Sequence, residues 1–367
     1  MQQRALRTVL LVHAIEETDR AGEALSMADR EHATREAAGA GPLPETARDG
    51  AALGGDSERF LARRAEGLLA RLRVRSPGID HILAVSGSAL GLDRSTLVLA
   101  FLAGVAIAFA DGDRIDLFAY PLFGLVIWNL IVYAVRVGRL FRAPERGSRV
   151  RGAFGRLYAR RARARIDALI AHSTGFNAPL APGLRRFAAD WSEVGQPVFL
   201  CRARRLLHLA AILAAAGLMA GYDFRGWILR EPAGWGTTIF GPASAHTALT
   251  ALYGPASAVS GVALPSADAI RALIWSGPTS GGGPAGQWIY LIDWTALLYI
   301  VFPRLLAVAV STVGLWRESA RLKVPEPVTG DYLREILPRP PAPPAPPGPP
   351  TPPGPLPPAA PSEPGEP

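Results

Sequence analysis

The sequence predicts an all-α fold: a polytopic membrane helix bundle of four transmembrane helices, with cytoplasmic helical regions and a disordered, proline-rich C-terminal tail. Three observations support this prediction. Hydrophobic residues make up 49% of the 367 positions, whereas charged residues make up only 19%. Uncharged apolar runs recur at nearly the length that a bilayer requires of a helix. Proline dominates the last part of the chain, so the apolar residues must be concentrated elsewhere.

Residues 1–92 are predicted to form a cytoplasmic helical region. Apolar residues recur with helical spacing in three stretches, at 4–18, 26–38 and 57–73. The first stretch imitates a secretory signal, but its apolar run is followed directly by acids rather than by a small-residue cleavage site. We therefore expect these residues to form soluble helices.

Four segments are predicted to cross the membrane, at 95–110, 117–135, 206–222 and 288–316. The first three carry no Asp, Glu, Lys or Arg and, as helices, extend about 24 to 28 Å, close to the ~30 Å hydrocarbon core. The fourth is interrupted by Asp293, Pro303 and Arg304, yet the aromatic residues at its ends resemble interfacial belts. A helix buried in a large soluble core is the alternative for each run, and the recurrence of such runs disfavours it. The first two spans together occupy residues 93–135.

Arginines between the second and third spans predict the orientation. Residues 136–205 hold sixteen arginines against four acids, whereas residues 223–287 hold three of each. Basic residues near membrane helices are retained in the cytoplasm, so we expect a multipass membrane protein with both termini cytoplasmic. The arginines nearest the spans are predicted to set topology and to contact anionic lipids: Arg136, Arg139, Arg142, Arg202, Arg204 and Arg205.

The arginine-rich stretch 154–169 also invites comparison with nucleic-acid-binding helices. On a helix Arg156, Arg160 and Arg163 share one stripe, but Arg161 and Arg165 fall nearly opposite, so no single basic face forms. Aromatic residues that would stack on bases are also few. Topology or lipid contact is therefore the favoured interpretation, a protein partner is the next, and nucleic acid is not expected.

Residues 223–287 are predicted to form a small external helical segment, and residues 317–367 a cytoplasmic disordered tail. The external string GPASA occurs at 241 and again at 254, and proline suits the first turn of a helix, which predicts short helices at 242–253, 255–262 and 266–275. A cap over the bundle is favoured, and a re-entrant hairpin is the alternative. The proline-rich part of the tail, from Pro338, is expected to be disordered or polyproline II.

No motif for catalysis, a cofactor or a metal is found. Lys323 is the only lysine, which excludes a Walker loop, and Cys201 is the only cysteine, which excludes a disulfide within the chain and a cysteine-based zinc site. We therefore expect no enzyme activity, no cofactor and no metal. The candidate site residues are instead polar residues within the spans: Asn129, His208, Asp293 and Arg304.

Helix geometry predicts the partners of two of these residues. Asp293 and Arg304 are eleven residues apart, so they return to the same helix face but lie roughly 16 Å apart along the axis. An ionisable group in a bilayer normally faces a partner on another helix. Depth predicts that Arg304 contacts Asn129, or a carbonyl freed by the proline before it. The prediction for Asp293 is an ion pair with Arg225 or Arg230.

Eight strings, in order along residues 6–316, carry a family resemblance: VHAIEETD (12–19), ADREHATREAA (28–38), FLARRA (60–65), NAPLAPGLRRFAADW (177–191), ARRLLHLAA (203–211), EPAGW (231–235), YGPASAVSG (253–261) and FPRLLAVAV (302–310). Together they resemble an uncharacterised bacterial membrane-protein family, domain of unknown function 2868. The resemblance supplies no catalytic residue. It implies a partner, because members are often encoded beside a cytoplasmic GTPase-like protein.

Two functions are predicted from these observations. The first is a noncatalytic membrane scaffold or anchor whose cytoplasmic regions, 1–92 and 136–205, dock the GTPase-like partner; the amphipathic stretch 4–15 motivates it, although such a stripe also suits a core. The alternative is a small-solute or ion transporter or channel, motivated by the polar residues in the spans. The expected partners are thus a bilayer with anionic lipids and a soluble protein, and the oligomeric state is not predicted.

Overall fold

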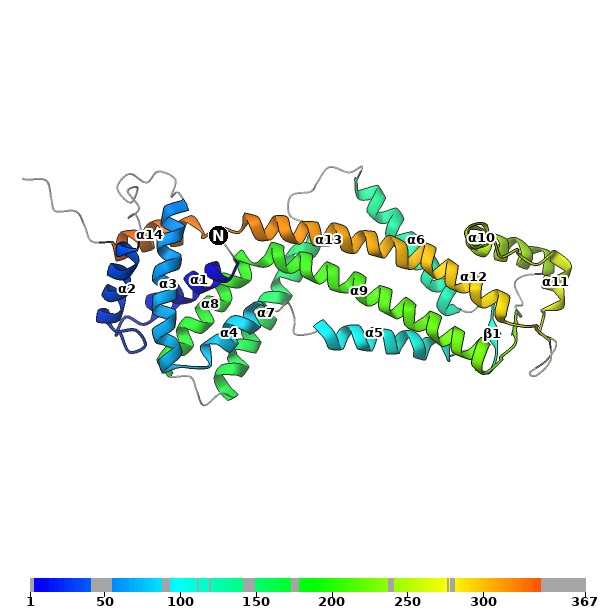
Figure 1. Ribbon diagram of the computed structural model, residues 1–367, viewed down its shortest axis with the longest axis horizontal. Coiled ribbons are helices and arrows are strands. Elements are labelled where there is room, and N and C mark those ends of the chain that lie inside the picture. Colours follow the sequence, from blue (N-terminus) through cyan, green and yellow to red (C-terminus); the bar gives the residue numbers. More distant parts are fainter. Residues whose placement is uncertain are drawn as a thin grey trace, which may run out of the picture.

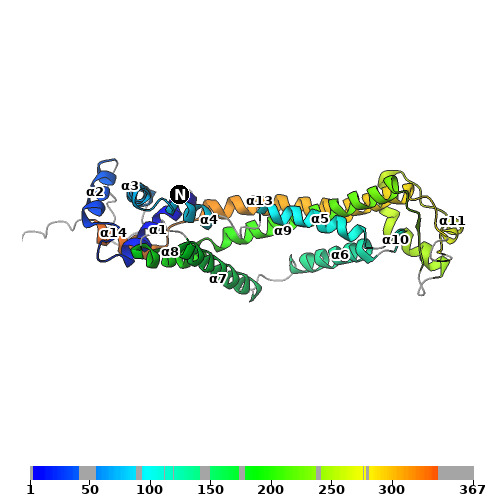
Figure 2. The same ribbon diagram turned by 90° about the horizontal axis from the view of Figure 1, so that it is seen from below.

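The computed structural model is an elongated all-α molecule (Figure 1). It has three parts: an N-terminal module, a bundle of apolar helices and a distal cap. Figure 2 shows that the module and the cap lie at opposite ends of the bundle. The structure describes residues 3–40, 55–87, 93–110, 112–118, 120–140, 149–172, 178–236, 241–275, 277 and 281–337.

The N-terminal module combines helices from three separate stretches of sequence. They are α1 (Gln3–Thr18), α2 (Met27–Gly39), α3 (Gly55–Arg75), α4 (Ile79–Gly87), α7 (Arg149–His172), α8 (Ala181–Val194), with a 3-10 turn Ala178–Leu180 before it, and α14 (Glu326–Ile336). Their apolar side chains form one core. The predicted cytoplasmic regions therefore pack together rather than standing as separate domains.

Helix α1 lies at the centre of this module. Its side chains from Val9 to Val12 are buried on nearly all sides, and it packs between α3 and α8. The approach to α8 is close, because a Cβ atom added to Gly183 would lie 2.8 Å from the Cα of Ile15. The apolar stripe at 4–15 is thus the module's own core, which corrects its use as evidence for a docking surface.

The bundle contains α5 (Asp93–Ala108), α6 (Tyr120–Leu140), α9 (Gln196–Asp223) and a continuous rod made of α12 (Gly286–Ala296), a π-helical turn (Leu297–Val301) and α13 (Phe302–Arg321). Two of these helices, 196–228 with its terminal π-helical turn and 286–321, are long and apolar enough to cross a membrane, and the apolar parts of the other two, 94–108 and 123–135, are shorter. The second predicted span began at 117, but the helix begins at Tyr120. The residues just before it form strand β1 (Ile115–Asp116), which pairs in parallel with β2 (Ala233–Gly234).

The adjacency of α9 and α13 can be tested with the natural cysteine. The Sγ atom of Cys201 lies 3.6 Å from the position that a Cβ would take at Gly314. Gly314→Cys should therefore form a disulfide with Cys201 under mild oxidation, measured as the loss of both reactive thiols in a non-aggregated chain. Trp316→Cys is the matched control: Trp316 is 69% exposed and points about 200° away around the helix. Equal cross-linking of the two variants would contradict this packing.

The distal cap corrects the predicted external helices. The two helices expected at 242–253 and 255–262 are one helix, α10 (Pro242–Ser260), which passes through Pro255 and ends at Gly261 with φ 73°. Burial of Leu249 and Tyr253 against the core of the cap holds the helix together across the proline. The third helix, α11 (Ala267–Ala272), is shorter than predicted and begins at the N-cap Ser266.

The predicted disordered region 317–367 is also corrected in part. Residues up to Arg321 complete α13, and α14 follows after a short extended linker. Helix α14 is ordered because Tyr332 and Leu333 are buried in the core of the N-terminal module. The proline-rich segment predicted to be disordered or polyproline II, residues 338–367, lies outside the described residues.

Candidate functional site

The bundle contains a buried polar cluster around Arg304. Its Nε and Nη2 atoms donate to the side-chain oxygen of Asn129, at 3.1 and 2.6 Å, and its Nη1 lies 3.1 Å from Nδ1 of His208. Asn129 and His208 are 2% and 3% exposed. The predicted contact between Arg304 and Asn129 is thus confirmed, and His208 joins it from a third helix, α9.

The backbone opens beside this cluster. Pro303 has no N–H, which leaves the carbonyl of Tyr299 without its helical partner, within the π-helical turn. The hydroxyl of Tyr133 lies 3.2 Å from that carbonyl oxygen and 3.3 Å from the side-chain oxygen of Asn129. The freed carbonyl therefore accepts from Tyr133 and not from Arg304. Sequence reasoning missed Tyr133, although it follows Asn129 by one helical turn.

The positive charge of Arg304 is stabilised by neutral hydrogen-bond acceptors. A guanidinium is always ionised, and among the described residues no carboxylate lies within 4.0 Å of Arg304. Because the guanidinium only donates, His208 must accept at Nδ1, and its neutral ring therefore carries the proton at Nε2. The arrangement holds one guanidinium cation inside the bundle with neutral partners.

The predicted ion pair of Asp293 is not formed with Arg225. Arg225 is fully buried and pairs instead with Glu231, at 2.7 Å. Its other donors bind the carbonyl of Ala108 and those of Gly112 and Arg114 at 2.5 and 2.6 Å, so it closes the turn after α5.

Asp293 faces a different side chain. Its carboxyl group contacts that of Asp223 at the end of α9. Arg230, the other predicted partner, has an exposed side chain and forms no ion pair with Asp293 among the described residues. The position along the helix axis correctly predicted that Asp293 lies level with the end of α9. It did not specify the direction in which each side chain points.

The arginines expected to set topology are placed only in part. Arg136 and Arg139 lie in the last two turns of α6, and Arg142 lies outside the described residues. Arg202 donates to the side-chain oxygen of Gln3 at 2.9 Å, which ties the start of α9 to α1. Arg204 is exposed and Arg205 is half-buried.

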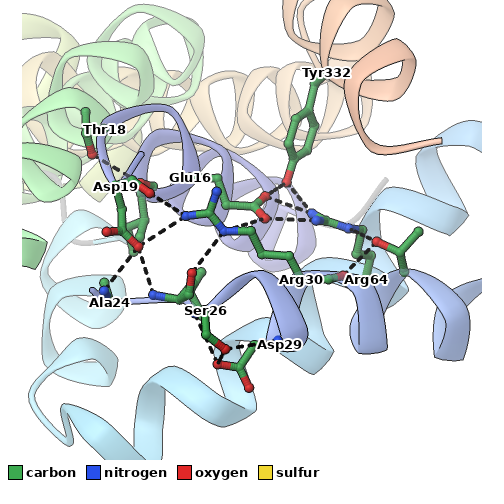
Figure 3. A network of polar contacts seen from close by, with 12 residues as sticks. Glu16, Thr18, Asp19, Ala24, Ser26, Asp29, Arg30, Arg64 and Tyr332 are labelled. Carbon is green, nitrogen blue, oxygen red and sulfur yellow. Dashed lines mark hydrogen bonds and ion pairs between the residues drawn. The ribbon is translucent and has the colours of Figure 1, made fainter. Parts of the chain in front are cut away.

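A second polar network lies in the N-terminal module, around Arg64 of α3 (Figure 3). Its two terminal nitrogens form a bidentate ion pair with Glu16 of α1, both at 2.8 Å, and the side chains are only 2% and 7% exposed. The hydroxyl of Tyr332, on α14, accepts from Arg64 at 2.5 Å and donates to Glu16. Thr34 of α2 accepts from Nε at 2.8 Å. One guanidinium thus connects four helices.

Neighbouring groups complete this network. Arg30 donates to the backbone oxygen of Asp19 at 2.5 Å, and the Asp19 carboxylate accepts from the backbone N–H groups of residues 23, 24 and 25 (Figure 3). Burial and the Glu16 carboxylate raise the pKa of Tyr332 well above its ordinary value, so its hydroxyl keeps its proton. The network is therefore charged, buried and internally paired.

A cavity of about 470 Å³ lies beside this network, between α1, α2, α3 and α14. Glu16, Arg64 and Tyr332 line it, together with charged residues of α2 and the last residues of α14. Sequence reasoning missed the site because it treated 317–367 as disordered. The spacing of Tyr332, Leu333 and Ile336 was the available signal, since these residues share one face of a helix.

His13 gives the module a predicted pH dependence. Its ring meets that of Tyr332 edge to face at 4.8 Å, and burial lowers its pKa, more than neighbouring carboxylates raise it. A histidine whose pKa is lower in the folded state leaves the unfolded chain with more bound protons. The contribution of His13 to the stability of the module should therefore be fully present above the pKa of histidine in the unfolded chain, about 6.5, and be lost as the pH falls below that value.

The measurement is amide hydrogen exchange in α1 between pH 7.5 and 5.5, corrected for the intrinsic rate. We expect His13→Gln to flatten the pH dependence. His32→Gln is the control, because the His32 side chain is 62% exposed. If His13→Gln and the natural chain lose protection in parallel, another group controls the response.

Comparisons with known proteins place most of these elements in one family. The profile described as "Protein of unknown function (DUF2868)" matches residues 152–339, just over half of the chain. The match runs from α7 through the last bundle helix to the end of α14, so it extends beyond Trp316, whereas the three resembling strings before residue 152 lie outside it. No curated protein and no solved structure matches the chain. The chain belongs to the DUF2868 family, whose members are described as proteins of unknown function.

Proposed function

We propose that this protein is a noncatalytic anchor of the bacterial inner membrane, with four membrane-crossing helices, that presents its N-terminal module to a soluble cytoplasmic partner. The observation that carries the proposal is the distribution of exposed apolar side chains. In the described part of the N-terminal module, only Met27 and Val74 are large exposed hydrophobics. The bundle exposes many, on each of its helices.

These bundle residues form outward faces rather than isolated positions. On α5 they include Leu99 and Leu102, on α6 Trp128, and on α13 Phe302 and Val310, all between 54% and 69% exposed. Soluble monomers rarely expose contiguous apolar patches beyond a few hundred Å². In a bilayer these side chains would contact lipid hydrocarbon instead of water, so their exposure would carry no free-energy cost. This supports membrane insertion of all four helices, including the two with shorter apolar parts.

The arrangement also supports a single orientation. The N-terminal module contains the basic helix α7 and receives the ends of α9 and α13, and the distal cap lies at the other end (Figure 1). Reporter fusions at Arg149, Gly261 and Pro340 test it, with cytoplasmic, external and cytoplasmic signals expected. An external signal at Arg149 or Pro340 would contradict the proposed topology.

The arginines after α6 should determine this orientation. Replacing Arg136, Arg139 and Arg142 with glutamine is expected to leave a measurable fraction of chains inverted, or with α6 uninserted, in the same reporter assay. The matched control replaces three arginines farther from the span: Arg156, Arg160 and Arg163. Unchanged topology in the first variant, or equal inversion in both, would show that other features set the orientation.

The proposed partner follows from the family resemblance, which points to a GTPase-like protein encoded nearby. Affinity purification of the tagged chain from detergent should enrich that protein above its recovery from a strain that lacks the chain. A chain with α1–α4 removed is not a suitable control, because α1 is the core of the module. Recovery equal to that background would count against the anchor function.

Ion or small-solute passage is the second candidate, and the Arg304 cluster is the observation that favours it. Four polar side chains from three helices meet inside the bundle, beside an opened backbone turn. Flux into proteoliposomes should then exceed that into empty vesicles and fall with Arg304→Gln. Equal flux in loaded and empty vesicles would remove this candidate.

A further inference from the structure

We propose that the cavity of the N-terminal module is the docking site of the chain's own proline-rich C-terminal segment, beginning at residue 338. The proposal concerns regulation of the module that the proposed anchor function presents to a partner, and it rests on that function only for its biological meaning. The docking itself is argued from the position, lining and charge of the cavity.

The floor of the cavity is fixed before anything binds. Arg64 and Glu16 satisfy each other in a bidentate pair, and Tyr332 bonds to both. Because these groups are already paired with one another, they need no charged ligand, and they hold α1, α3 and α14 in place. A preorganised floor lowers the ordering that binding requires.

Apolar surface at the mouth is left uncovered by the described residues. Met27 lines the cavity and is 63% exposed, and in the described part of the module only Val74, away from the cavity, is another large exposed hydrophobic. Ile336 and Leu337 line the same cavity. These positions would contact apolar side chains of an occupant.

The position of α14 selects the occupant. Leu337 is both a lining residue and the C-cap of α14, so the thirty residues that follow it start at the mouth of the cavity. A tethered segment has an effective local concentration in the millimolar range. Even a segment with weak affinity therefore occupies the cavity for a substantial fraction of the time, and a free competitor would have to displace it.

The chemistry of the segment matches the cavity. Residues 338–352, PRPPAPPAPPGPPTP, combine proline and alanine with one base, Arg339, and no acid. Proline-rich peptides dock in grooves lined by aromatic and aliphatic side chains, with little loss of backbone freedom. On the cavity wall Glu31 and Glu335 form no ion pair within 4.0 Å among the described residues, and they complement Arg339.

A direct binding experiment tests the proposal in detergent-solubilised protein. A labelled synthetic peptide of residues 338–352 is titrated into a chain that ends at Leu337 and into the full chain. We expect submillimolar binding to the shortened chain and at least tenfold weaker binding to the full chain, whose own segment competes. Met27→Glu should weaken binding to the shortened chain at least threefold, whereas Val74→Glu, at another exposed apolar position that does not line the cavity, should not. No binding to the shortened chain at 1 mM peptide, or equal binding to both chains, would overturn the proposal.

A second measurement uses chains of natural length, in case shortening impairs folding. In a Cys201→Ser background, Met27→Cys should react with a thiol reagent at least fivefold faster when residues 338–367 are replaced by a Gly-Ser segment of the same length. Val74→Cys should react at the same rate in both chains. An unchanged rate at position 27 would show that the cavity is not covered by the segment. Acceleration only after a partner protein is removed would assign the cavity to that partner instead.

Discussion

Replacing Arg64 with methionine should lower the free energy of unfolding of the N-terminal module by about 3 to 5 kcal/mol. The change leaves the Glu16 carboxylate, whose side chain is 7% exposed, without its bidentate partner. It also removes the donor to Tyr332, which weakens the attachment of α14. Amide hydrogen exchange in α1 and α14 measures the loss directly, because these helices contact one another through this network.

Two control variants separate the buried pair from charge effects in general. Arg59→Met removes an exposed pair with Asp56, with side chains 72% and 55% exposed, and should change stability by less than about 1 kcal/mol. Combining Arg64→Met with Glu16→Leu should recover much of the loss, because neither position of the pair then carries a buried, unpaired charge. If the double variant loses as much protection as the two single changes added together, the unpaired charge is not the cause.

The network also explains how much of the module could be predicted. Helices α1 to α3 follow from apolar periodicity, and the spacing of Tyr332, Leu333 and Ile336 indicates a helix at α14, but this spacing does not indicate which core the helix completes. A helix of eleven residues is marginal alone, and its stability comes from packing. Because Arg64 and Tyr332 are more than 260 residues apart, local patterns could not reveal that α14 packs on α1 and α3.

More of the bundle than of the N-terminal module could be predicted, because the thickness of a bilayer fixes the length of the helices that cross it. The rise of 1.5 Å per residue also gives depth, which was enough to bring Arg304 to Asn129. Depth does not give the rotation of a helix about its own axis, however. Asp293 therefore meets Asp223, while Arg225 turns to the carbonyls after α5. His208 was a candidate site residue, but its contact with Arg304 was not predicted, for the same reason.

The packing of α5 on α9 gives the second large expected effect. A Cβ at Gly217 would lie 2.0 Å from the backbone oxygen of Phe101, and one at Gly104 would lie 2.0 Å from that of Ala214. Both contacts involve backbone, which no rotamer change can relieve. Gly217 and Gly221 have the Gly-x-x-x-Gly spacing of close membrane-helix pairs, a signal that was present in the sequence.

Gly217→Ala should therefore force α5 and α9 apart and destabilise the bundle by about 1 to 3 kcal/mol, and Gly217→Leu should prevent its assembly. The effect should be larger than for an ordinary helix pair, because the apolar part of α5, 94–108, is short and relies on α9 for its buried face. The measurement is the thermal midpoint and the monodisperse fraction in detergent. Gly314→Ala is the matched control, since its new Cβ would meet only Cys201, at 3.6 Å. Equal behaviour of Gly217→Ala and Gly314→Ala would mean that the two helices are not in backbone contact, and α5 would then need another source of stability within the membrane.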